Sequence, residues 1–162
     1  MTAYGTPEDC AAYHLARGNT DWAAAEDSPD TAREAAREAG SDFIDSYRRR
    51  FPGSKTDGRS QAREWPRINA FDLEGEEIAD DEVPIEIEYA SYEAALLIVQ
   101  GTDLSPSQAV GGTIGRKRVK AGPVETETEY KTPSSQPRFQ KIMNILEPVL
   151  ANGSVTVDLL RV

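Results

Sequence analysis

The segment that most constrains the fold is a run of mostly apolar residues over 83–100, opened by Val83-Pro84. One face of a helix is traced by Ile85, Tyr89, Tyr92, Leu96 and Val99, and the later part is widened by Ala94, Ala95, Leu97 and Ile98. A helix that is apolar on most sides must be buried on most sides. We therefore expect this helix to be the centre of the core and to end at Gly101.

Other segments carry helix signals and are expected to pack around that helix. Thr6-Pro7-Glu8-Asp9 combines a hydroxyl N-cap, an early proline and first-turn acids, which predicts a helix start. A second start at Ser28-Pro29-Asp30 predicts a helix to about Arg50, with Gly40 on a small-residue face that allows close packing. Asp21 to Ala25 is expected to be a short connector, and 138–150 an amphipathic helix bent or ended near Pro148.

The chain of 162 residues is long enough for one domain with a core. We expect a mainly α fold: a small helical bundle with an appended β-hairpin and an extended C-terminal tail. The helical core should cover 1–112 and include a long connection over 51–82. The projecting hairpin should cover 113–131, and the last helix with a β-prone tail 132–162. A connection as long as 51–82 is usually functional or interfacial.

The predicted hairpin has one basic and one acidic strand. Its strands are expected over 113–120 and 124–130, around Ala121-Gly122-Pro123. The basic residues are Arg116, Lys117, Arg118 and Lys120, and the acidic ones are Glu125, Glu127 and Glu129. Opposite charges across an antiparallel pair are stabilising, but a hairpin without an apolar face is marginal alone. We expect the hairpin, and the alternating Val155, Val157 and Leu159 of the tail, to contact a partner.

Trp65-Pro66-Arg67 separates a positive segment from a negative one. Seven basic residues, including Arg48, Arg49, Arg50 and Arg63, stand within 48–67 against Asp57 and Glu64, and ten acidic residues without Lys or Arg occupy 72–93. Segregated charge suits docking against copies of the chain or neighbouring proteins. Trp65 is expected to be a buried anchor, and the arginines to be interface candidates.

The basic segment also has a nucleic-acid interpretation. Its cations could bind phosphates while Phe51 and Trp65 stack on bases of single-stranded DNA. Against this stands a formal net charge of -10, whose field opposes a polyanion. The alternative is that the segment pairs with the acidic segment of the same chain or of the next copy.

No catalytic, metal or cofactor site is predicted. Cys10 and His14, each the sole residue of its type, share a helix face and are interpreted as packing residues. The acidic cluster around Asp80-Asp81-Glu82 lacks the ligand spacing of a calcium loop and is expected to cap the helix after Val83. Gly111 to Lys117 lacks the ending of a phosphate loop. The single cysteine and the absence of a signal-like N-terminus predict a protein made in the cytoplasm.

Several motifs together resemble one protein family. They are Tyr13 in the first helix, Phe43 to Tyr47, Gln61 to Arg67 with Trp65-Pro66-Arg67, the acidic loop with Ile78, the helix from Val83-Pro84 with Glu93-Ala94-Ala95, and the hairpin from Arg116 to Glu129. Up to about Leu150 the chain resembles a family of tailed-phage proteins. These are often labelled DnaT-like single-stranded-DNA-binding proteins and are similar to head–tail connector (adaptor, or head-completion) proteins.

The connector side of this resemblance implies a structural protein of the virion neck, made in the bacterial cytoplasm. It implies a homo-oligomeric ring, typically a dodecamer, bound beneath the portal protein. A downstream stopper or tail-completion protein would be the next partner, and genomic double-stranded DNA would pass through the channel without specific binding. The alternative implied by the label is a single-stranded-DNA-binding replication protein that uses Arg48 to Arg67. Neither implies a catalytic residue or a cofactor.

Overall fold

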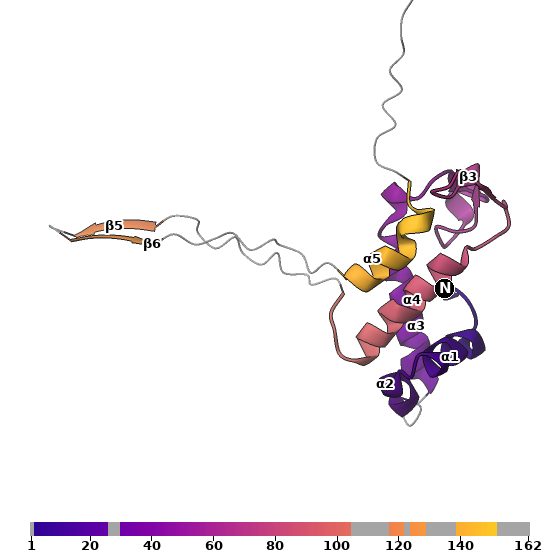
Figure 1. The fold of residues 1–162 in the computed structure, drawn as a ribbon, viewed down its shortest axis with the longest axis horizontal. Coiled ribbons are helices and arrows are strands. Elements are labelled where there is room, and N and C mark those ends of the chain that lie inside the picture. Colours follow the sequence, from indigo (N-terminus) through magenta and orange to yellow (C-terminus); the bar gives the residue numbers. More distant parts are fainter. Residues whose placement is uncertain (1, 26–29, 105–116, 122–123, 129–138, 152–162) are drawn as a thin grey trace, which may run out of the picture. The chain divides into compact units, whose positions relative to one another are not determined.

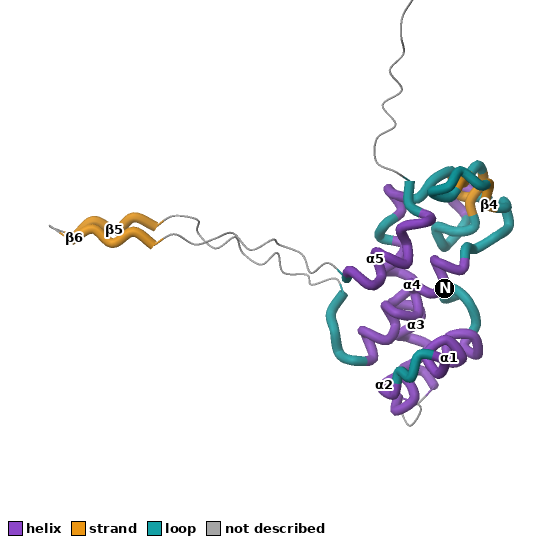
Figure 2. Tube along the Cα trace, in the orientation of Figure 1, coloured by secondary structure: helices purple, strands orange, loops and turns teal. Residues whose placement is uncertain are grey.

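The computed structural model describes residues 2–25, 30–104, 117–121, 124–128 and 139–151 (Figure 1). The chain divides into two units, Met1–Leu104 with Gln140–Val162, and Ser105–Phe139. The helices of the first unit are α1 (Pro7–Ala16), α2 (Thr20–Ala24), α3 (Asp30–Asp45), α4 (Ile85–Val99) and α5 (Gln140–Leu146). The mainly helical fold that the sequence predicts is confirmed, and Figure 2 shows how little strand the first unit contains.

The predicted start of α1 is confirmed by its cap. Thr6 is the N-cap, and its hydroxyl accepts a hydrogen bond from the backbone N–H of Asp9 at 3.1 Å. Pro7 lies in the first turn, where its missing N–H costs nothing. Glu8 and Asp9 place negative charge at the positive end of the helix.

The central position predicted for α4 is also confirmed. All residues from Ala90 to Leu96 are buried, and α3, α1, α2 and α5 all contact this helix (Figure 1). Its Tyr92, Ala95 and Leu96 join one core cluster with Cys10, Tyr13, Trp22 and Ala36. One detail of the prediction is wrong: Ile85 is 51% exposed, because it lies about 200° around the helix from Ile87, the fully buried residue of the same turn.

Close packing of α3 on α4 depends on Gly40. A β-carbon at this position would lie 2.7 Å from the carbonyl oxygen of Ser91 and 2.9 Å from the backbone nitrogen of Ala95. Ala95 is itself fully buried. The small-residue face predicted for this helix therefore brings the two backbones together.

A buried carboxylate ties three helices to one another. Glu93 of α4 is 3% exposed, and it accepts hydrogen bonds from Tyr13 Oη of α1 at 2.8 Å and from Lys141 Nζ of α5 at 2.6 Å. The guanidinium carbon of Arg17 lies 3.5 Å from the centroid of the Tyr13 ring. A buried charge needs such partners to offset its desolvation.

The sequence overestimates the length of the second helix. α3 ends at Asp45, and Arg48–Arg50 form a separate 3-10 turn, η2. Tyr47 N–H donates to the Ile44 carbonyl at 3.0 Å, which tightens the last turn, and the Ser46 hydroxyl donates to the Phe43 carbonyl at 2.6 Å. For the segment after Asn19 the prediction underestimates helix, because the expected connector forms α2.

The connection over 51–82 is more ordered than the irregular loop that was predicted. β1 (Ser54–Lys55) pairs with β2 (Arg67–Ile68), and β3 (Ala70–Phe71) pairs with β4 (Glu77–Ile78), both antiparallel. The 3-10 turn η3 (Gly58–Ser60) lies between β1 and β2. Gly53 has a φ of +64°, and a β-carbon there would clash with the Ile68 carbonyl oxygen, so this turn requires glycine.

The last helix breaks where the sequence predicts. α5 gives way to a 3-10 turn, η4 (Glu147–Val149), which contains Pro148. In the second unit, β5 (Lys117–Ala121) and β6 (Val124–Thr128) form the predicted antiparallel hairpin. Its register places Arg118 opposite Glu127 and Lys120 opposite Glu125.

Candidate nucleic-acid interface

Trp65 is a buried anchor, as predicted. It is 1% exposed, and its ring lies 5.8 Å from that of Phe51 in an edge-on contact. Its backbone N–H donates to Tyr4 Oη at 3.3 Å, and its peptide bond to Pro66 is cis. A base cannot stack on a ring that is enclosed in this way, so the aromatic platform of the nucleic-acid interpretation cannot be Trp65 or the buried Phe51.

Arg63 fastens the connection to α3 and to the N-terminal segment. Its Nη1 donates to Asp42 Oδ1 at 2.5 Å and to Asp45 Oδ2 at 3.1 Å, while its Nε donates to the Thr2 carbonyl at 2.8 Å. Burial alone would lower the pKa of Arg63, but the hydrogen bonds and charges of Asp45 and Asp42 outweigh it and raise this pKa. Arg63 is 8% exposed, and its guanidinium group stabilises the fold.

Arg67 has the same kind of internal role. It donates to the carbonyls of Pro52 at 2.6 Å, Gly53 at 2.8 Å and Glu64 at 3.1 Å. The carboxylate of Glu64 lies 3.3 Å from Arg67 Nη1 and 3.3 Å from Lys55 Nζ. The planar fork of arginine suits this set of carbonyl ligands, and it leaves Arg67 6% exposed.

The basic segment therefore pairs within the chain, but not with the acidic segment. The carboxylates that it uses belong to Asp42, Asp45 and Glu64. The acids of the 72–82 loop are mostly exposed, and Asp72 organises the loop by accepting the N–H groups of Glu74 and Glu76 at 2.9 and 2.8 Å. The predicted cap of α4 is wrong, because Pro84 is its N-cap and no side chain caps it.

The positive charge that stays on the surface is concentrated in η2, which we call the arginine turn (Arg48–Arg50). All three residues are exposed. Within the described part of the chain, no carboxylate lies at ion-pair distance from their guanidinium groups. Arg59 of η3 is exposed as well. Unpaired guanidinium groups on consecutive residues are suited to phosphate oxygens.

Two aromatic rings precede the arginine turn. Phe43 and Tyr47 are half-buried, and their rings meet edge-on with centroids 5.5 Å apart. Burial raises the pKa of Tyr47, and the nearby charge of Arg50 opposes this, so the phenol is neutral at physiological pH. Partly exposed rings beside exposed arginines are the combination that single-stranded nucleic acids require.

A small polar hollow lies on the other side of the arginine turn. It has a cavity volume of about 240 Å³ and is bounded by Arg50 and by side chains of α5 and η4. Gln140 Nε2 donates to Asn144 Oδ1 across one helical turn at 2.6 Å, and the Ala151 N–H donates to the Arg50 carbonyl at 2.7 Å. These amides are not among the residues predicted from the sequence, although their i, i+4 spacing lies on the polar face of an amphipathic helix.

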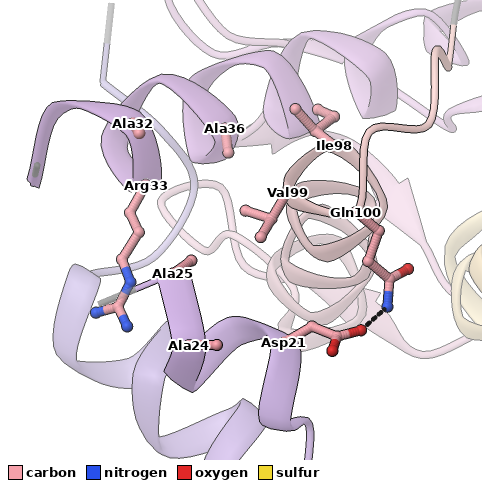
Figure 3. A pocket seen from close by; sticks show the side chains of 9 residues that line it. All are labelled: Asp21, Ala24, Ala25, Ala32, Arg33, Ala36, Ile98, Val99 and Gln100. Carbon is pink, nitrogen blue, oxygen red and sulfur yellow. Dashed lines mark hydrogen bonds between the residues drawn. The ribbon is translucent and has the colours of Figure 1, made fainter. Parts of the chain in front are cut away.

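A larger groove, shown in Figure 3, lies elsewhere and has a mixed polar and apolar lining. It is lined by Asp21, Ala24, Ala25, Ala32, Arg33, Ala36, Ile98, Val99 and Gln100. Its charged groups are engaged: Arg33 Nη2 donates to the Trp22 carbonyl at 2.8 Å, and Asp21 accepts from Gln100 at 2.6 Å. The groove therefore offers the methyl groups of its alanines beside polar side chains that are bonded within the chain.

Cys10 and His14 are packing residues, as predicted. Both are fully buried. Burial raises the pKa of the Cys10 thiol to about 12 and lowers that of the His14 imidazole to about 4. Both are neutral at physiological pH, so the thiol is not activated as a nucleophile.

The remaining predicted interface residues belong to the hairpin and the tail. Lys117 and Arg118 are on β5, and Glu125 and Glu127 are on β6. The other predicted interface residues, Arg116, Glu129, Val155, Val157 and Leu159, lie outside the described residues. No helix in the described part of the chain is both long and apolar enough to span a bilayer.

Fold and surface together define a small helical protein that carries three consecutive exposed arginines at one turn. The chain belongs to the family described as "Putative DnaT-like ssDNA binding protein", whose model matches residues 1–162. This is a family of binding proteins, and the match agrees with one side of the resemblance drawn from the sequence. Searches of the curated proteins and of the solved structures give no match.

Proposed function

We propose that the chain binds single-stranded DNA and that the arginine turn is its phosphate contact. The observation that carries this proposal is the exposure of Arg48, Arg49 and Arg50, without carboxylate partners among the described residues, in a family described as binding single-stranded DNA. Of the seven basic residues in 48–67, Arg63 and Arg67 serve the fold and Lys55 is paired to Glu64. Arg59 and the three residues of the arginine turn remain, and we assign the phosphate contact to the turn because it offers three guanidinium groups on consecutive residues.

Stacking comes from Phe43 and Tyr47 in this proposal, not from Trp65. Their rings are partly exposed and lie just before the arginine turn in sequence. Stacking of a base on an aromatic side chain contributes about 1–3 kcal/mol and tolerates any base. The net charge of -10 limits the affinity, so binding should be moderate and sensitive to salt.

The test is a titration of labelled single-stranded DNA followed by fluorescence anisotropy at about 150 mM salt, where weak phosphate attraction is largely screened. Replacing Arg48, Arg49 and Arg50 by Ala should weaken binding at least tenfold. Arg59→Ala is the matched control, because it removes an exposed arginine outside the turn. Equal binding by the triple variant and the wild type would disprove the assignment.

A second candidate function is the head–tail connector. It is favoured by the hairpin, whose register sets a basic strand against an acidic one, and by an arginine turn and an acidic 72–82 loop on one subunit. Surfaces of opposite sign on one chain suit a head-to-tail ring, in which one face meets the other face of the next copy. The partners would be the portal protein and a downstream stopper or tail-completion protein, with genomic DNA passing through.

Co-purification separates the two candidates. The protein is mixed with assembled portal from the same gene cluster, and the mass of the complex is measured. A stoichiometric complex, without binding of single-stranded DNA, would support the connector and disprove the first proposal. DNA binding without portal association would support the first proposal and contradict the connector function.

A further inference from the structure

We propose that the hollow between the arginine turn and α5 is a subsite for one unpaired nucleobase. This inference rests on the proposed function and deepens it, because it says how a single strand would be distinguished from a duplex. The hollow is lined by Arg50, Gln140, Met143, Asn144, Glu147 and Leu150. Its volume of about 240 Å³ is below the roughly 300–1,000 Å³ typical of pockets for drug-sized ligands, which suits a single heterocycle.

The chemistry of its wall matches the edge of a base. Gln140 Nε2 donates to Asn144 Oδ1 at 2.6 Å, which fixes the two amides relative to each other. This bond leaves Gln140 Oε1 as an acceptor and Asn144 Nδ2 as a donor, next to each other on the same helix face. A donor beside an acceptor is complementary to the Watson–Crick edge of each of the four bases, because each presents one donor next to one acceptor there.

The other lining residues complete the subsite. Met143 is half-buried and supplies a polarisable apolar surface for the face of the ring, and Leu150 is the buried floor. Arg50 links the hollow to the arginine turn, because its carbonyl is fixed by the Ala151 N–H at 2.7 Å while its side chain stays exposed. A phosphate held by Arg48 or Arg49 would therefore have its neighbouring base close to the amides.

Selectivity for single strands follows from this arrangement. In a duplex the Watson–Crick edges are occupied, so the amide pair has nothing to bind, whereas an unpaired base can enter the hollow. The same wall accepts any base, since every base presents a donor next to an acceptor and can enter with either face turned to the wall. We expect single-strand binding without a strong sequence preference.

The experiment compares two labelled single strands of about 20 nucleotides, longer than a typical single-strand site. One carries bases and the other is abasic, so the phosphates are common to both. Wild-type protein should bind the strand with bases at least tenfold more tightly. In the double variant Gln140→Ala/Asn144→Ala this ratio should fall to the part that stacking on Phe43 and Tyr47 supplies, and in Asn144→Asp, which keeps the shape but loses the donor, it should fall as well.

Controls keep the outcomes separate. Gln140 and Asn144 are exposed, so the variants should keep the wild-type circular dichroism and melting temperature. Gln100→Ala is the matched control, because Gln100 is an exposed glutamine bonded to Asp21 on a different surface, and its ratio should stay at the wild-type value. A double variant that retains the wild-type ratio would overturn the subsite.

Failure of the subsite and failure of the proposed function have different signatures. If wild-type protein binds both strands equally, the base subsite and the stacking on Phe43 and Tyr47 are both wrong, while phosphate binding by the arginine turn stands. If wild-type protein binds neither strand at about 50 mM salt, where phosphate contacts are strongest, both proposals are wrong.

Discussion

Gly40 of α3 lies so close to Ser91 of α4 that a β-carbon on the glycine would be 2.7 Å from the Ser91 carbonyl oxygen. In an exposed helix a change of glycine to alanine gains about 1 kcal/mol of helix propensity. Here the added methyl group must displace backbone atoms, and overpacking of this kind costs about 1–3 kcal/mol. The close approach of the two backbones therefore decides whether Gly40→Ala stabilises or destabilises the protein.

We predict that Gly40→Ala lowers the free energy of unfolding by about 1 kcal/mol, measured by urea denaturation. The control is Ala39→Gly at the neighbouring exposed position, which should lose about 1 kcal/mol through propensity alone. A more stable Gly40→Ala protein would mean that α3 and α4 have room to move apart.

Removal of the Trp65 ring should have a larger effect. We predict that Trp65→Ala lowers the free energy of unfolding by about 3–5 kcal/mol, because the ring is 1% exposed and packs on Phe51. This is enough to unfold a marginal domain. Leu15→Ala, at a position that is 81% exposed, should change stability by less than about 0.5 kcal/mol. Near-wild-type stability of Trp65→Ala would contradict the anchor.

Much of this fold could be predicted from local patterns. The apolar pattern of α4 requires burial wherever the helix lies, and Thr6 caps α1 through atoms three residues away. Pro148 acts through its own backbone geometry. In each case the deciding interaction is encoded within a few residues or in a periodic face.

The roles of the arginines could not be predicted in this way. Arg67 is buried because its fork meets the carbonyls of Pro52 and Gly53, which only the folded turn brings to it. Arg63 depends on Asp42 and Asp45 of a helix about twenty residues earlier in the chain. Arg48, in the same basic segment, stays exposed. Charge in a sequence does not reveal which guanidinium groups find internal ligands, so the candidate site emerged only from the structure.

A buried histidine gives the fold a pH dependence. His14 is fully buried, and burial lowers its pKa from 6.5 to about 4, although Glu93 and the Tyr92 backbone favour its charged form. Lys141 and Arg17 oppose protonation, Asn19 Nδ2 is bonded to Nδ1, and the Trp22 ring lies 4.6 Å away. The unfolded chain therefore takes up this proton at a higher pH than the folded chain.

We predict that stability is greatest above pH 6.5 and falls as the pH drops from about 6.5 towards 4, because the unfolded state binds the proton first. The His14 contribution to this loss should be roughly 2 kcal/mol between pH 7 and pH 5. His14→Gln, which cannot titrate, should show a flatter profile over this range in urea denaturation at each pH. If stability fell with pH equally in the wild type and in His14→Gln, the pKa of His14 would be the same in the folded and unfolded protein.

The salt dependence of DNA binding counts the phosphate contacts of the arginine turn. Each contact to a single strand contributes roughly 0.7 to the slope of log affinity against log salt concentration. Three contacts, from Arg48, Arg49 and Arg50, should give a slope of about −2 between about 50 and 200 mM salt. Arg49→Ala should reduce its magnitude by roughly 0.7, whereas Arg59→Ala should leave the slope unchanged. If Arg59→Ala reduced the slope and Arg49→Ala left it unchanged, the phosphate contact would lie in η3 and not in the arginine turn.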